Sequence, residues 1–198
     1  MNPLKKVTGI VAPLDMANVD TDQVIPKQFL KRIERTGFGE FAFFNWRYLE
    51  DGVPNPDFVL NRAEYQNAPI LVAGPNFGSG SSREHAPWAL KEYGFTAIIA
   101  PSFGDIFRSN CFQNGMAPVI LTQTSVDTIL ARALRNPGYT LTVEVEAKRV
   151  YDEDGFSESF EMEPFRQESL LQGLDEIERS LQNNNVITDF EEAHPARW

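Results

Sequence analysis

Short apolar runs alternate with amphipathic segments through the middle of the chain. Three continuous apolar runs have the length of strands that are buried on both faces. They lie at residues 69–73, 96–100 and 117–121. Between them, residues 82–93 and 103–114 have helical patterns that end at Gly94 and Gly115. Strands that alternate with helices indicate a parallel sheet, so the pattern predicts an α/β fold with a parallel βαβαβ core.

The segments around this core are predicted to be a strand, a helix and a hairpin. Residues 7–14 suit an opening strand, and Thr124 or Ser125 suits the start of a helix with one apolar stripe. Residues 139–147 alternate strictly between apolar and polar, as in a half-exposed strand. A turn at 152–155 leads to a second strand at 156–162, which predicts a peripheral hairpin.

The C-terminal part of the chain is polar and acidic. Residues 166–182 suit one or two amphipathic helices, and residues 183–198 are expected to form a loose tail. The length suits one domain over residues 1–198.

Composition and charge exclude several classes of protein. A net charge of −10 argues against binding to nucleic acid or to an anionic membrane. Cys111 is the single cysteine, so an intramolecular disulfide and a cysteine-held iron–sulfur cluster are excluded. No apolar run has the length of a membrane span or the pattern of a signal peptide. The expected location is the cytoplasm.

A glycine-rich loop at residues 74–87 is the strongest chemical signal. It follows a predicted strand and precedes a predicted helix, whose free N–H groups and dipole favour a bound anion. Its three glycines let a ligand approach the backbone closely. At its end lie two hydroxyls, Ser81 and Ser82, and then Arg83, which can bind a carboxylate or phosphate through two hydrogen bonds. The spacing fits neither a P-loop, nor a dinucleotide fingerprint, nor a hydrolase elbow.

A structural interpretation of the same residues is also open. Ser81 and Glu84 have the spacing of a capping box, although Pro87 would then move the start of the helix nearer to Glu84. Upstream, Asp20 and Asp22 flank a threonine, which is typical of helix caps and Asx turns.

Several motifs along the chain together resemble one family. They are Asn18-Val19-Asp20-Thr21-Asp22, Thr36-Gly37-Phe38-Gly39, Asn76-Phe77-Gly78, Gly80-Ser81-Ser82-Arg83-Glu84-His85-Ala86-Pro87-Trp88 and Ala100-Pro101-Ser102-Phe103. In these motifs the chain resembles the small subunits of 3-isopropylmalate dehydratase, the isopropylmalate isomerase of leucine biosynthesis. That subunit is the separate-chain counterpart of the swivelling C-terminal domain of aconitase. The resemblance covers nearly the whole chain, with departures at Ser79 and at Glu178-Arg179-Ser180.

The resemblance implies a fold, an activity and a set of site residues. The implied fold is a swivelling β/β/α domain, and the implied activity is that of a hydro-lyase. Ser81 would be the general base that takes a proton from carbon, and Arg83 with Ser82 would bind a substrate carboxylate. Asp22 would be an active-site carboxylate near that serine. His85 lies four residues after Ser81, and both a structural and a catalytic role are open for it.

The resemblance also implies a partner and a cofactor outside this chain. Removal of water requires a Lewis acid, because hydroxide is a poor leaving group. His85, His194 and Cys111 are too few and too scattered to hold a metal, so no metal site is expected here. In the family, a four-iron four-sulfur cluster lies on a large subunit. The expectation is a heterodimer in which this chain carries half of the active site.

Substrate choice is expected to depend on residues 28–39. Phe29 and Leu30 offer an apolar surface for an isopropyl group, and the alternative is that they only fill the core or a subunit interface. Two other functions stay open at this stage. One is the small subunit of a related hydro-lyase that acts on citramalate or homoaconitate, and the other is a dicarboxylate-binding module without turnover.

Overall fold

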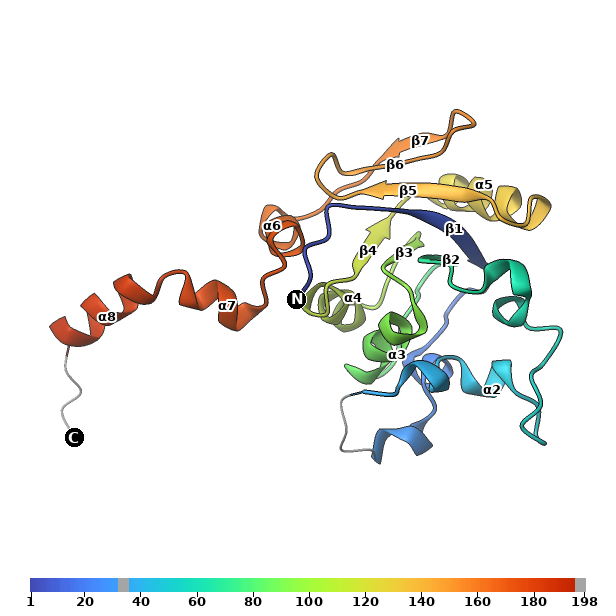
Figure 1. The fold of residues 1–198 in the computed structure, drawn as a ribbon, viewed down its shortest axis with the longest axis horizontal. Helices are drawn as coiled ribbons and strands as arrows, with labels where there is room; N and C mark the ends of the chain where they lie inside the picture. Colours follow the sequence, from blue (N-terminus) through green and yellow to red (C-terminus); the bar gives the residue numbers. More distant parts are fainter. Residues whose placement is uncertain (32–35, 195–198) are drawn as a thin grey trace.

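The computed structural model describes residues 1–31 and 36–194, and these form one seven-stranded sheet with attached helices (Figure 1). The strand order is β4-β3-β2-β1-β5-β6-β7. The strands are β1 (Lys6–Leu14), β2 (Ile70–Ala73), β3 (Ala97–Ala100), β4 (Ala117–Ile120), β5 (Thr140–Glu144), β6 (Arg149–Tyr151) and β7 (Ser157–Ser159). Strands β1 to β4 are parallel, whereas β5, β6 and β7 continue the sheet antiparallel from the other side of β1.

The parallel half is the predicted βαβαβ core. Helix α3 (His85–Tyr93) connects β2 to β3, and helix α4 (Asp105–Gln113) connects β3 to β4. Every residue of β2 and β3 is buried, which explains their continuous apolar sequences. Leu71 and Ile98 point to the core beneath α3, and their neighbours point to a second core beneath helix α5 (Gln123–Arg135). The predicted core is confirmed.

Shorter elements surround this core. They are α1 (Thr21–Val24), α2 (Phe44–Arg47) and the 3-10 turns η1 (Lys27–Lys31), η2 (Gly39–Phe41), η3 (Val59–Asn61) and η4 (Ala63–Tyr65). At the C-terminal end lie α6 (Pro164–Gln172), α7 (Glu176–Leu181) and α8 (Asn184–Ala193). No helix in the described ranges is long and apolar enough to cross a bilayer.

The predicted hairpin is instead a three-stranded meander. The alternating run at 139–147 ends as a strand at Glu144, where the chain reverses and returns as β6. Lys148 adopts a φ of 51° in this reversal, a conformation that alternation of apolar and polar residues cannot reveal. The predicted turn at 152–155 then leads to β7.

Two helix starts differ from prediction. Helix α3 begins at His85 rather than near residue 82, and α5 is capped by Thr122, whose hydroxyl accepts from the Ser125 N–H, rather than by Thr124 or Ser125. For α5, local sequence offers several hydroxyl candidates, and the structure selects Thr122. For α3, none of the serines caps the helix, because its N-cap is Glu84.

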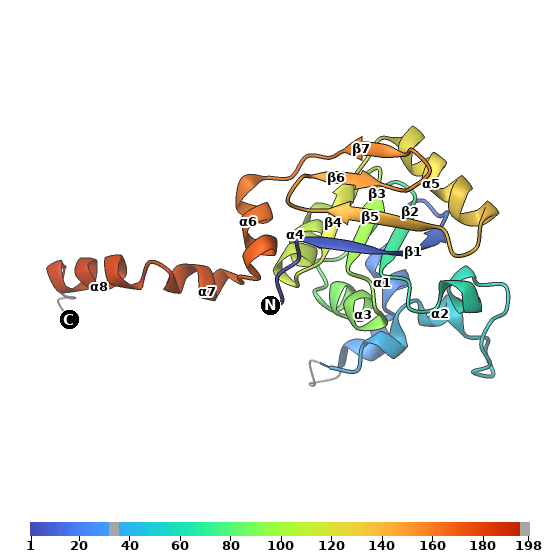
Figure 2. The same cartoon turned by 45° about the horizontal axis from the view of Figure 1, so that its top comes forward.

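The C-terminal segment, expected to be loose, forms helix α8 over most of its length. Figures 1 and 2 show α7 and α8 extending away from the rest of the molecule. The described residues of α8 include none that are buried. Residues 195–198 of the expected tail lie outside the described residues.

Candidate functional site

Three loops meet at the carboxyl ends of β1, β2 and β3. Parallel neighbouring strands end at the same edge of a sheet, so the loops that follow them lie side by side. The Thr21 N–H donates to the carbonyl of Ser79 at 2.9 Å, which joins the first loop to the glycine loop. The Phe77 N–H donates to the carbonyl of Ser102 at 3.1 Å, which joins the glycine loop to the third.

Close packing explains two of the glycines, against a side chain at Gly78 and against backbone at Gly104. A Cβ on Gly78 would lie 2.2 Å from the Phe107 ring, and Gly78 has a φ of 71°. A Cβ on Gly104, in the third loop, would lie 2.5 Å from the carbonyl oxygen of Gly78. Side chains at either position would force the loops apart. The glycine loop is therefore held rigidly between its two neighbours.

Ser81 and Ser82 are exposed, and the capping box is absent. Glu84 is the N-cap of α3 and makes no side-chain cap bond, so the alternative in which Ser81 and Glu84 cap each other is wrong. Pro87 explains this start, because it lies in the first helical turn where its missing N–H is not needed. The carbonyl of Ser81 accepts from the Arg83 N–H at 2.8 Å and from Thr21 Oγ1 at 3.2 Å. Within the described residues, nothing hydrogen-bonds to the Ser81 hydroxyl.

Arg83 and Asp22 form an ion pair across two of these loops. The Arg83 side chain is 15% exposed and the Asp22 side chain 37%, so the pair lies at the surface with the guanidinium partly sunk. Lys27 approaches Asp22 as well, with its Nζ 3.3 Å from Oδ2. The structure thus brings Asp22 next to Arg83, which follows Ser81 by two residues in the sequence.

Asp20 has the structural role that its sequence suggested. Its Oδ1 accepts from the Gln23 N–H at 2.8 Å, and the Gln23 side chain accepts from the Asp20 N–H in return. This is a complete capping box for α1. The two aspartates therefore have different partners: Asp20 caps α1, and Asp22, in the first turn of α1, pairs with Arg83.

His85 packs as part of an aromatic group. Its ring centroid lies 5.3 Å from that of Phe38 and 4.9 Å from that of Trp88. Phe38 is fully buried, so the His85 ring covers core side chains at the start of α3. These contacts give His85 a structural role.

Phe29 and Leu30 lie in η1 and are half-buried against the core. The Phe29 ring stacks on Phe41 with centroids 4.0 Å apart and meets the edge of Phe44 at 4.8 Å. Residues 32–35 of the predicted specificity segment lie outside the described residues. Beyond them, the Glu92 carboxylate accepts from the Phe38 and Gly39 N–H groups and fixes the segment to α3.

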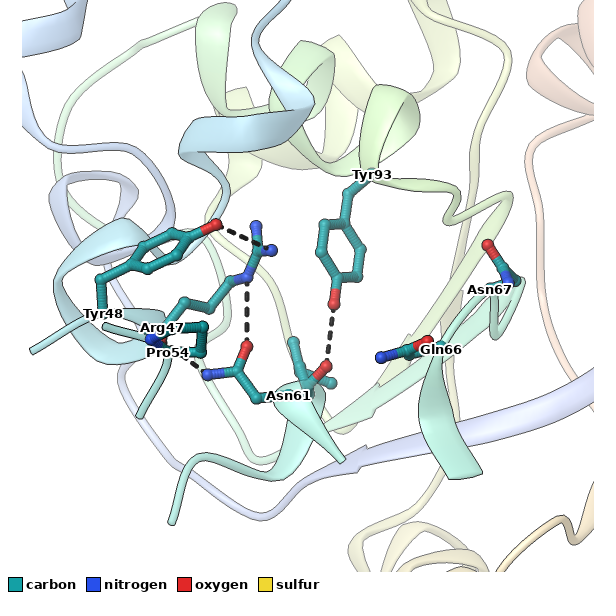
Figure 3. Close-up of a pocket in the computed structure, with 8 residues that line it drawn as sticks. Arg47, Tyr48, Pro54, Asn61, Gln66, Asn67 and Tyr93 are labelled. Atoms are coloured by element: carbon teal, nitrogen blue, oxygen red, sulfur yellow. Dashed lines mark hydrogen bonds between the residues drawn. The ribbon is translucent and has the colours of Figure 1, made fainter. Parts of the chain in front are cut away.

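A cleft of about 320 Å³ lies elsewhere, at the amino end of the parallel strands (Figure 3). Arg47 lies beside Tyr48 and Tyr93, with its guanidinium carbon 4.7 Å from the centroid of the Tyr93 ring. Arg47 also donates to the backbone carbonyls of Gly39 and Ala42, so it holds the turn at η2 together. Neither Ser81 nor Arg83 lines this cleft. The carboxyl-edge loops, not the cleft, are the candidate site.

The described residues do not fit a metal or a cluster. No three His, Cys, Asp or Glu side chains in the described ranges come close enough to hold a metal ion. Cys111 is fully buried, and burial raises the pKa of its thiol, so it does not offer a thiolate ligand.

Sequence reasoning missed how the first loop supports the second. Thr21 binds the carbonyl of Ser81, and Lys27 pairs with Asp22, and neither was assigned a role. Thr21 lies in the Asn18–Asp22 motif and Lys27 follows it by five residues, but the pairing of β1 with β2 that brings them to the loop has no local signal in the sequence.

The chain is similar to known proteins over its whole length. Residues 1–124 match the family described as the aconitase C-terminal domain, and residues 127–164 match the family described as LeuD_N. A 3-isopropylmalate dehydratase small subunit of Koribacter versatilis is 54% identical over 194 residues, covering 98% of this chain and all of that protein. The small subunit of Rhodopirellula baltica is 57% identical over 186 residues, covering 93% and 95%.

A solved structure shares the fold. It is the crystal structure of 3-isopropylmalate dehydratase from Methanocaldococcus jannaschii, which is 22% identical and has a TM-score of 0.63. The likeness covers 94% of this chain and 99% of that one. It confirms the expected fold class, the swivelling β/β/α domain.

Proposed function

The chain belongs to the family of 3-isopropylmalate dehydratase small subunits, and we propose that it contributes Ser81, Arg83 and Asp22 to an active site completed by a large subunit. The reaction interconverts 2-isopropylmalate and 3-isopropylmalate by loss and re-addition of water, in leucine biosynthesis. The observation that carries the proposal is the exposed Ser81 hydroxyl beside the Arg83–Asp22 pair, at an edge of the sheet that is open to a partner.

Arg83 is proposed to bind a substrate carboxylate. A guanidinium has five N–H donors, so one ion pair with Asp22 leaves donors for a second carboxylate. Asp22 would hold the guanidinium in a fixed orientation, and the exposed hydroxyl of Ser82 adds a donor at the same place. In this proposal Asp22 is a positioning residue for Arg83.

Ser81 is proposed to take a proton from the substrate carbon and to return it in the reverse step. The alkoxide needs stabilisation that the helix dipole alone does not give, since the dipole contributes about 0.3–2 kcal/mol and each pKa unit corresponds to about 1.4 kcal/mol. The Arg83 charge and the exclusion of water by a docked partner would supply the rest.

The group that accepts the departing hydroxide is proposed to lie on the large subunit. The described part of this chain does not fit a metal or an iron–sulfur cluster, as its carboxylates, histidines and cysteine are dispersed. We place the four-iron four-sulfur cluster of the family on the partner. The enzyme is proposed to be a cytoplasmic heterodimer.

Reconstitution tests the proposed function. The isolated chain is expected to purify colourless and without isomerase activity, and activity is expected on anaerobic addition of the cognate large subunit. A stoichiometric cluster on this chain alone would contradict the shared site. Binding of isopropylmalate by the assembled complex without turnover would instead indicate a dicarboxylate-binding module, and faster turnover of citramalate or homoaconitate would indicate a related hydro-lyase.

A further inference from the structure

The C-terminal helices α7 and α8 form an arm with an uncovered apolar face. Five large apolar side chains on these two helices are between 42% and 72% exposed. They are Ile177, Leu181, Val186, Ile187 and Phe190. Ile177 and Leu181 are four residues apart in α7. In α8, Phe190 follows Val186 by four residues and Ile187 by three, so the side chains of each helix share one side. Figures 1 and 2 show that this arm points away from the sheet.

The base of the arm is firmly fixed. Arg179 of α7 pairs with Glu168 at 3.0 Å, and its guanidinium carbon lies 4.0 Å from the centroid of the Phe165 ring. The Glu178 carboxylate lies 3.5 Å from the amino group of Met1. Both contacts tie α7 to the body of the molecule. The direction of α7 is therefore set, whereas the five apolar side chains of the arm remain at least 42% exposed.

Helix α8 by itself is expected to be only marginally stable in water. It has ten residues, and helices shorter than about 12–15 residues are marginal without tertiary packing. Among the described residues, the side-chain contacts of α8 are local, between Phe190 and His194. A surface that covers Ile187 and Phe190 would supply the missing packing energy.

The charge of the arm favours one kind of occupant. Residues 175–193 contain six acidic side chains and a single basic one, Arg179. The whole chain carries a net charge of −10, so a second copy of it would repel the arm. The complementary surface is an apolar groove bordered by Lys and Arg on a different protein.

We infer that the arm docks in such a groove on the large subunit, as an assembly contact outside the active site. The inference rests on the large-subunit partner of the proposed function. The base of the arm lies beside Met1, which also contacts Gly115 just before the amino end of β4. The glycine loop lies at the opposite ends of these parallel strands. The arm therefore strengthens association without taking part in the chemistry.

Affinity for the large subunit tests the inference. The double variant Ile187→Glu with Phe190→Glu is expected to raise the Kd for the cognate large subunit at least about tenfold. The kcat at saturating large subunit is expected to stay unchanged. The melting temperature of the isolated chain should also stay unchanged, because neither side chain is buried. Asn185→Glu is the matched control: it adds a charge on the other side of α8, removes no apolar surface, and should change the Kd less than about twofold.

Three results would overturn the inference. One is an unchanged Kd in the double variant. Another is loss of kcat at saturating large subunit, which would place the arm at the active site. The third is a wild-type dimer that the double variant abolishes, which would make a second copy the occupant. In the first and third cases the wild-type complex keeps its isomerase activity and the proposed function survives. If the wild-type chain does not bind the large subunit at all, both proposals fail.

Discussion

Ser81 is held in the loop through its backbone carbonyl. Thr21 and Arg83 hold the Ser81 carbonyl, whereas the hydroxyl group faces solvent. A residue held by its backbone with a free hydroxyl is well placed to react with a ligand. It contributes little to stability through its side chain.

We expect Ser81→Ala to fold and assemble normally and to lose about 10²–10⁴-fold in kcat, the usual contribution of a general base. Melting temperature and kcat measured on one preparation of the complex check this. Ser79→Ala in the same loop is the matched control and should keep its activity. A Ser81→Ala enzyme with nearly normal kcat would remove Ser81 from the chemistry.

The proposed role of Arg83 can also be tested with one substitution, because lysine keeps the positive charge but not the planar geometry of the guanidinium. Arg83→Lys keeps the charge but loses the planar fork that binds a carboxylate through two hydrogen bonds. A charged hydrogen bond is worth about 1.5–3 kcal/mol, so kcat/KM should fall about 10–100-fold. Steady-state kinetics of the reconstituted complex measure the change. Near-normal kinetics would mean that Arg83 only anchors Asp22.

At the scale of elements, η1 combines packing with a proposed role in specificity. Phe29 stacks on Phe41 and lies against the core, which is what a purely structural residue would do. Its partial exposure still leaves an apolar surface, and the pocket for the isopropyl group stays a prediction.

Phe29→Ala or Leu30→Ala is expected to lower kcat/KM for isopropylmalate by about 10–200-fold, the value of an apolar contact of this size. The smaller analogue citraconate should lose less. The measurements are kcat/KM for isopropylmalate, kcat/KM for citraconate, and the affinity of each variant for the large subunit. Equal losses for both substrates together with weaker association would mean that these side chains only pack.

The turn between β6 and β7 is attached to α5 by Asp152. This carboxylate is 1% exposed, pairs with Arg132, and accepts from the Tyr139 hydroxyl and the Phe156 N–H. Burial by itself would raise the pKa of Asp152, but these hydrogen bonds and the Arg132 charge outweigh it and lower the pKa below its ordinary value. A lowered pKa in the folded state stabilises the fold at pH values above the pKa of the unfolded chain. That stability is lost as the pH falls through the folded value.

We therefore expect Asp152→Asn to lower the free energy of unfolding at pH 7 by about 1–3 kcal/mol, the range for a charged or buried hydrogen bond. The difference between variant and wild type should shrink as the pH falls below about 4. Denaturant unfolding at several pH values measures both effects. Asp154→Asn, at an exposed position in the same turn, is the control. A difference that is independent of pH would show that the Asp152 charge does not matter.

At the scale of the whole molecule, different features lie at the two ends of the parallel strands. Their carboxyl ends carry the candidate site, and their amino ends carry the Arg47 cleft and the base of the arm. The candidate site is a surface rather than a closed cavity, which agrees with a site shared between two subunits. We therefore expect the isolated chain to be inactive until the large subunit is added, because half of a site cannot exclude water by itself.

Local sequence determined the core strands, their crossover helices and the chemistry of the glycine loop. Continuous apolar runs such as 69–73 are typical of strands buried on both faces. Glycines followed by Ser81, Ser82 and Arg83 predict an anion-binding turn. These are properties of neighbouring residues, so a single sequence contains them. The reversal at Lys148 has no local signal, since several local conformations have similar energies there. The start of α3 at His85 agrees with the shift toward Glu84 that Pro87 implies.

Tertiary structure alone decided which distant residues meet. The pairing of β1 with β2 brings Asp22 to Arg83 and Thr21 to Ser81, over about sixty residues of sequence. Such contacts depend on strand order and register, and these are fixed by the packing of the whole sheet rather than by any local pattern. The same holds for the arm: local sequence predicted helical residues up to 182 but not their direction, and the contacts of Arg179 with α6 set the direction of α7.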